Sequence, residues 1–200
     1  MASKLNLYDV AICIILPKSY KRLIKKMKVG IDLDKKHLVK LGIVALIVFL
    51  LDQAVKMWVL NNFTVGEARP FIPGVLQLRY FQNTGMAFGI LAEYQWVFIV
   101  FVPIALILFG VFAIKGKWFP HWLQQVTLVA VIISGFSNWV DRIAHGFVID
   151  MFEPTFIRFA IFNVADSFIT VGSIILFITF ILSELRMASR KTSVCKKYIE

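Results

Sequence analysis

Four long apolar segments alternate with polar segments along the chain. The apolar segments cover about residues 38–60, 94–114, 121–139 and 162–182. Each has about 20 residues, the length that a helix rising ~1.5 Å per residue needs to cross the ~30 Å hydrocarbon core of a bilayer. The pattern predicts an all-α integral membrane protein with four transmembrane helices.

The segment 61–93 is too polar to cross a membrane, and prolines and glycines interrupt it. Its β-branched and aromatic residues stand next to turn signals, a pattern that favours short strands or a loop lying on the membrane face. We therefore expect a small β or loop element between the first and second helices.

The basic residues lie mainly on one side of the predicted membrane. Seventeen Lys and Arg residues fall before the first helix or at its start, in the turn 115–121, or after the fourth helix; four fall in the other connecting segments. Because cytoplasmic segments are enriched in Lys and Arg, both termini are predicted to be cytoplasmic, and the β/loop element extracytoplasmic. The predicted parts are a basic cytoplasmic arm (1–37), a four-helix membrane domain (38–184) and a basic cytoplasmic tail (185–200).

The amino-terminal arm does not have the pattern of a leader. Its apolar run, Val10–Leu16, is too short to span, and its basic cluster follows the run instead of preceding it. A lipoprotein cleavage box ending at Cys13 is weak because bulky Ile12 precedes the cysteine. Two interpretations stay open: an interfacial cytoplasmic arm, or a true start at Met27.

The composition agrees with a membrane protein: 59% of residues are hydrophobic and the mean hydropathy is +0.77. The net charge of +10 could indicate nucleic acid, but no basic stripe is interleaved with stacking aromatics, so we expect no nucleic-acid partner. Cys13 and Cys195 lie in predicted cytoplasmic segments without zinc-ligand spacing, so we expect no disulfide, metal or cofactor.

Polar residues converge on the predicted outer boundary of the membrane. In membranes such residues are costly unless they pair or have a function, so their convergence predicts one site. Its candidate residues are Asp52, Lys56, Asn83, Asn138, Arg142, Asp150, Asn163 and Asp166.

Several of these residues also have purely structural interpretations. Asp52 and Lys56, four residues apart, form either a neutralising pair or two snorkelling anchors. Asn163 fits a helix N-cap with Asp166 at the third helical position, which stabilises a helix without chemistry. For Asp141 we favour a structural ion pair or a headgroup anchor.

The chemistry most open to this set is acid–base catalysis by carboxylates. The sequence has no His cluster, no reactive Cys and no Gly-x-Ser-x-Gly motif. Two carboxylates in contact share a proton, so one can activate water while the other protonates a carbonyl oxygen, which hydrolyses a peptide bond. Arg142 could fix one carboxylate by bidentate hydrogen bonds.

Two other classes of function compete with this one. An ion or proton pathway would require polar residues at mid-membrane depth, and the second apolar segment has none at its centre. A metal enzyme would use Asp141, Asp150 and Asp166, but the cationic Arg142 would compete with the metal ion for them.

Five short blocks occur in order along residues 38–182, and together they resemble the lipoprotein signal peptidases (signal peptidase II), a bacterial family of four-span aspartic peptidases. The blocks are Asp52 with Lys56, Asn83–Phe88, Asn138–Arg142, Val148–Asp150 and Phe162–Asp166. The resemblance implies that Asp150 and Asp166 form the catalytic dyad, and that Asn83, Asn138, Arg142 and Asn163 line the site.

The resemblance also implies a substrate, an inhibitor and a location. The substrate is a prolipoprotein with a diacylglyceryl-modified cysteine, cut just before that cysteine, and the inhibitor is globomycin. The location is the bacterial cytoplasmic (inner) membrane, with the active site at the outer face. The chain departs from the family pattern at Ser137, usually Gly, at Met151, usually Phe, and in its long amino-terminal arm.

Overall fold

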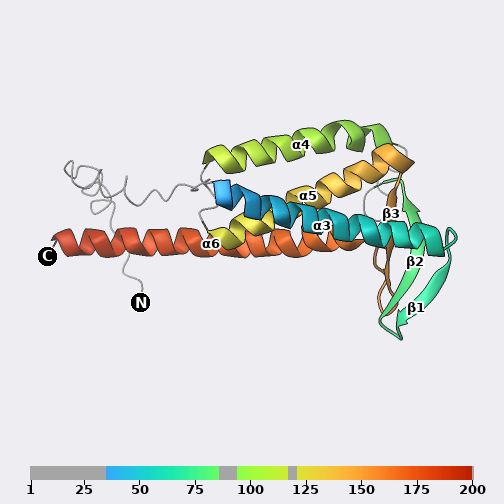
Figure 1. The fold of residues 1–200 in the computed structure, drawn as a ribbon. Coiled ribbons are helices and arrows are strands. Elements are labelled where there is room, and N and C mark those ends of the chain that lie inside the picture. The colour runs from blue at the N-terminus through green and yellow to red at the C-terminus, as the bar shows by residue number, and fades with distance from the viewer. Residues whose placement is uncertain (1–34, 86–93, 117–120, 200) are drawn as a thin grey trace.

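The computed structural model describes residues 35–85, 94–116 and 121–199, which form helices that lead into a small sheet at one end (Figure 1). The helices are α3 (Lys35–Asn62), α4 (Gln95–Gly116), α5 (Trp122–His145) and α6 (Val164–Ile199). The strands are β1 (Ala68–Ile72), β2 (Leu76–Asn83) and β3 (Val148–Pro154). The predicted arm, 1–37, lies outside the described residues except for its last three.

Three of the described helical segments are long and apolar enough to cross a membrane: α3, α5 and residues 164–186 of α6. In α4 the described apolar stretch, Trp96–Val111, is shorter. Large apolar side chains are exposed along the outer helix faces, which suits contact with lipid; they include Leu46, Ile47, Leu50, Ile107, Leu108, Ile174 and Phe177. The structure thus supports a membrane protein, and four crossings remain a prediction.

Helix α5 packs against each of the other three helices. Its contact with α6 is close at Gly172, where an added Cβ would lie 2.6 Å from a methyl carbon of Val131. The helix ends at Gly146, whose φ of 79° suits glycine and whose N–H bonds the carbonyl of Arg142. The helix therefore continues for six residues beyond Trp139, where the predicted membrane span ends.

The sheet is antiparallel, with strand order β1-β2-β3. Strands β1 and β2 confirm the predicted β element between the first two helices. The third strand was not predicted: it comes from the segment between α5 and α6 and pairs with β2, placing Asp150 opposite Phe81. An isolated bridge between Phe152 and Phe162 then brings the start of α6 to this strand.

A small apolar core joins the sheet to the end of α3. Its buried members are Val59, Phe63, Tyr80, Ile149 and Met151. Met151 has no exposed surface, so the residue that departs from the family pattern is a packing residue. This core fixes β3, and therefore Asp150, against the end of the helical bundle.

The carboxyl-terminal helix is longer than predicted. The sequence indicated a span over 162–182 and then a tail, whereas the backbone of α6 stays helical to Ile199 and extends beyond the other helices (Figure 1). The predicted boundary at residue 185 therefore does not coincide with a helix end.

Candidate active site

The amino-terminal end of α6 has a reciprocal cap. The Asn163 side-chain oxygen accepts a hydrogen bond from the backbone N–H of Asp166 at 2.9 Å, and an Asp166 carboxylate oxygen accepts one from the N–H of Asn163 at 3.2 Å. The predicted Asn-x-x-Asp capping arrangement is confirmed. It fixes Asp166 in the first helical turn, where the helix dipole favours a negative charge.

Asp150 on β3 lies in the same hydrogen-bond network. Its two carboxylate oxygens accept hydrogen bonds from the side-chain amides of Asn163, at 2.7 Å, and Asn83, at 2.8 Å. The Asn83 oxygen accepts the N–H of Gly85, which leaves its amide group directed at Asp150. Asn163 therefore touches both predicted catalytic residues, one through each end of its amide.

Asn138 on α5 completes this network. Its amide nitrogen donates to Asp166 at 2.8 Å, and its oxygen accepts from Asn163 and from the ammonium group of Lys56. Because Lys56 can only donate, it forces the oxygen of Asn138 inward and the NH₂ group toward Asp166. All the described side-chain hydrogen bonds to Asp150 and Asp166 thus come from neutral amides.

The burial of Asp150 changes its acid–base behaviour. Asp150 has no exposed surface, and this burial, reinforced by the nearby negative charge of Asp166, raises its pKa from 3.8 to about 7. The hydrogen bonds from Asn83 and Asn163 and the charge of Lys56 oppose the rise. Such a group carries a proton over much of the range below neutral pH.

Lys56 lies at the centre of a second, fully charged cluster below the dyad. Its ammonium nitrogen is 2.7 Å from carboxylate oxygens of both Asp52 and Asp141, and all three side chains have at most 1% exposure. The snorkelling interpretation of Asp52 and Lys56 is therefore wrong. The structural ion pair expected for Asp141 is confirmed, with Lys56 as its partner.

Arg142 contacts main-chain oxygens instead of a carboxylate. Its guanidinium donates to the carbonyls of Gly85, at 2.7 Å, and Asn138, at 3.3 Å, and stacks 4.7 Å from the ring centre of Phe98. The predicted bidentate contact with a carboxylate is not among its described contacts. Its buried Nε has no hydrogen-bond partner among the described residues, so this cation keeps a donor at the site.

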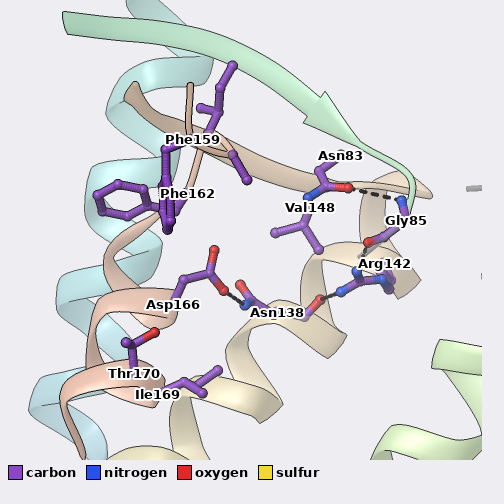
Figure 2. Close-up of a pocket in the computed structure, with 12 residues that line it drawn as sticks. Asn83, Gly85, Asn138, Arg142, Val148, Phe159, Phe162, Asp166, Ile169 and Thr170 are labelled. Atoms are coloured by element: carbon purple, nitrogen blue, oxygen red, sulfur yellow. Dashed lines mark hydrogen bonds between the residues drawn. The ribbon is translucent and has the colours of Figure 1, made fainter. Parts of the chain in front are cut away.

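A cavity of about 260 Å³ lies over this network. Figure 2 shows Asp166, Asn138, Arg142 and Asn83 around it, with apolar side chains on the remaining walls. The full lining is Asn83, Gly85, Asn138, Arg142, Val148, Phe159, Ala160, Ile161, Phe162, Asp166, Ile169 and Thr170. Asp166 thus borders the cavity directly, whereas Asp150 is buried behind it.

All eight predicted site residues lie at the sheet end of the bundle, as expected, in two connected groups. The first group is Asn83, Asn138, Arg142 and Asp166, which line the cavity, with Asp150 and Asn163 buried behind them. The second group is Asp52 and Lys56, which belong to the charged cluster behind Asn138. Sequence reasoning missed Gln53, which donates to Asp141 and Ser137. A polar residue inside an apolar span, next to Asp52, was the signal that could have identified it.

The arrangement also bears on the metal-enzyme alternative. One of the three metal ligands that this alternative requires is Asp141. Its carboxylate accepts hydrogen bonds from Lys56, Gln53 and the N–H of Ile149. Its carboxylate is thereby committed to structural contacts, and a cation there would have to displace an ammonium group.

The fold and the site define a membrane protein with a carboxylate-bearing cavity at the end of its helical bundle. Residues 44–182 match the family described as Signal peptidase (SPase) II. The chain belongs to this family, and it is a membrane protease.

Individual relatives agree. Lipoprotein signal peptidases of Streptococcus pyogenes serotype M1 and serotype M5 (strain Manfredo) are each 42% identical over 147 residues, which cover 72% of this chain and 93% of the relative. A solved structure described as a bacterial membrane enzyme, determined by the in meso method at 2.3 Å, is 29% identical with a TM-score of 0.67, covering 73% of this chain and 89% of that one. A second solved bacterial membrane enzyme, determined by the same method at 1.9 Å, is also 29% identical and has a TM-score of 0.64. The match covers 70% of this chain and 91% of that one.

Proposed function

We propose that this protein is an aspartic endopeptidase that removes signal peptides from diacylglyceryl-modified prolipoproteins. It cuts just before the lipid-modified cysteine, and Asp150 and Asp166 activate the attacking water. Membership of the signal peptidase II family supports the reaction and the class of substrate. The two carboxylates beside the cavity support the mechanism.

The observation that carries the mechanism is the pair of asparagine amides that hold the two carboxylates: Asn163 donates to Asp150, Asn138 donates to Asp166, and Asn163 also donates to Asn138. Neutral amides can stabilise negative charge on the pair without fixing both carboxylates as ions. Asp150, with its pKa raised to about 7, is suited to hold the shared proton. Asp166, at the start of a helix and at the cavity wall, is suited to take a proton from water.

The proton on Asp150 would then pass to the carbonyl oxygen of the scissile bond. Because Asp150 has no exposed surface, this step requires a shift of the side chains around it when substrate binds. Arg142 lines the same cavity. Its buried Nε–H has no hydrogen-bond partner among the described residues, so it is suited to bind a substrate carbonyl oxygen once the side chain shifts.

The cavity is small for the complete substrate. Pockets for drug-sized ligands hold about 300–1,000 Å³, and this one holds about 260 Å³. We infer that it takes the peptide around the scissile bond, while the two acyl chains stay in the surrounding bilayer. Globomycin, a cyclic peptide, would compete for this space.

The bacterial cytoplasmic membrane is the location that the family and the apolar helices support. The asymmetric distribution of Lys and Arg supports an orientation with both termini in the cytoplasm and the sheet end at the outer face. The site would then open where a translocated prolipoprotein presents its modified cysteine.

The test is to incubate purified full-length protein in detergent with a diacylglyceryl-modified lipobox peptide and to identify the products by mass. We expect a single cut before the modified cysteine, blocked by globomycin and unaffected by excess chelator. The same peptide without the lipid should be cut far more slowly. No cleavage of the modified peptide, or cleavage that chelator abolishes, would contradict the proposal.

A further inference from the structure

Ser137 and Gln53 form an uncharged link between the two structural carboxylates. Ser137 is fully buried on α5, and its hydroxyl donates to Asp52 at 2.7 Å. The side-chain amide of Gln53 on α3 donates to the Ser137 hydroxyl and to Asp141, each at 2.9 Å. This link runs alongside Lys56, which joins the same two carboxylates by charge.

Each of these carboxylates also holds the backbone directly before a dyad residue. A carboxylate oxygen of Asp52 accepts the N–H of Ala165 at 2.8 Å, and one of Asp141 accepts the N–H of Ile149 at 3.4 Å. Ala165 immediately precedes Asp166, and Ile149 immediately precedes Asp150. The placement of Asp52 relative to Asp141 therefore bears on the placement of the two segments that present the dyad.

We propose that Ser137 and Gln53 are positioning residues for the dyad, which act through Asp52 and Asp141 to set the distance between the backbones of Asp150 and Asp166. This inference rests on the proposed function. Neither side chain lines the cavity, so neither is placed to bind substrate.

The physical reason is the steep dependence of proton transfer on geometry. Without the Ser137 hydroxyl, the Asp52 oxygen that accepts it keeps, among the described residues, the bond from Lys56, and Gln53 loses one acceptor. Asp52 can then rotate, and the first turn of α6 shifts with it. A displacement well below 1 Å is enough to slow a reaction that needs two carboxylates in register.

Ser134 offers a matched control. It lies three residues before Ser137 on the same helix and has no exposed surface, yet its hydroxyl has no hydrogen-bond partner among the described residues. Ser134→Ala and Ser137→Ala therefore delete the same buried atom, and they differ in whether a hydrogen bond is lost.

The experiment compares kcat and KM for the diacylglyceryl-modified peptide among purified full-length variants. Ser137→Ala should lower kcat about five- to tenfold with KM within about twofold, and Ser137→Thr should restore most of the loss. Gln53→Leu should have a similar effect, and combining it with Ser137→Ala should add little, since both break one link. Ser134→Ala should match the unaltered protein.

An unchanged kcat in both Ser137→Ala and Gln53→Leu would overturn the inference. So would a drop in kcat in Ser134→Ala equal to that in Ser137→Ala, or variants of Ser137 and Gln53 that change KM alone. Gln53 is only half-buried, so we expect Gln53→Leu to fold. If Ser137→Ala does not fold, the kcat of Gln53→Leu tests the inference by itself. If the unaltered protein fails to cut the modified peptide, the proposed function falls, and this inference falls with it.

Discussion

Two pairs of aspartates lie within one hydrogen-bond network, and they differ in what partners them. The inner pair, Asp52 and Asp141, brackets the ammonium group of Lys56. The described side-chain hydrogen bonds of the outer pair, Asp150 and Asp166, come from the neutral amides of asparagines. The ammonium group commits the inner carboxylates to structural contacts, whereas the proposed mechanism assigns the exchangeable proton to the outer pair, whose side-chain partners are neutral.

The largest expected effect comes from removing either outer carboxylate. Asp150→Asn and Asp166→Asn should each lower cleavage at least about a thousandfold, because the two act as one unit, and the double variant should be hardly worse. Glu153→Gln is the control, since it neutralises a carboxylate on the same strand that pairs with Arg79. Near-normal turnover in either single variant of the dyad would rule out the proposed mechanism.

Changes at the inner pair and Lys56 should lower the stability of the folded protein. Lys56→Met leaves two carboxylates buried without their cation, and we expect a loss of about 3–5 kcal/mol in the free energy of unfolding. Thermal unfolding in detergent measures it. Breaking the exposed pair Arg69–Glu67 by Arg69→Gln is the control and should cost about 0–1 kcal/mol.

A double-mutant cycle sharpens this prediction. Asp52→Asn combined with Lys56→Gln should cost less than the sum of the two single changes, because each single change leaves an unbalanced charge near hydrocarbon. Strict additivity would show that the two residues do not act as a pair.

Stability should also depend on pH through Asp150. The pKa of Asp150 in the folded protein, about 7, lies above its ordinary value of 3.8. The protonated residue therefore contributes to the free energy of unfolding in acid, and this contribution is lost as the pH rises through about 7. From pH 5 to pH 8 the loss is roughly 2–3 kcal/mol. Asp150→Asn cannot ionise, so its stability relative to the unaltered protein should improve over that range. A constant difference between the two proteins would contradict the raised pKa.

The smallest expected effect is that of the amino-terminal arm. No candidate site residue precedes Asp52. Deleting residues 2–26 should therefore change specific activity by less than about threefold, as measured with the purified protein. Complete loss of activity in a protein that still inserts into the membrane would assign the arm a role.

Much of the site could be predicted because membrane topology converts sequence position into depth. The predicted directions of the helices, together with the cost of burying polar groups in a membrane, were enough to predict that Asp150 and Asp166 lie at the same end of the bundle. The cap formed by Asn163 and Asp166 was also predictable, because it depends on residues three positions apart.

Contacts between distant segments could not be predicted in the same way. Strand β3 is short, and its pairing with β2 joins residues more than 60 positions apart, which no local pattern reveals. The apolar pattern stops near Trp139, but α5 continues through Asp141 and Arg142, because Asp141 pairs with Lys56 and Arg142 lies over Phe98. Partners supplied by other helices decided both cases.

The most direct test of the contrast between the two pairs is an infrared titration of the carboxyl C=O stretch in the purified protein. We predict a protonated-carboxyl band that disappears with a midpoint near pH 7, is absent in Asp150→Asn and persists in Glu153→Gln. A spectrum without such a band, or a band that remains in Asp150→Asn, would contradict the assignment of the shared proton to the amide-held pair.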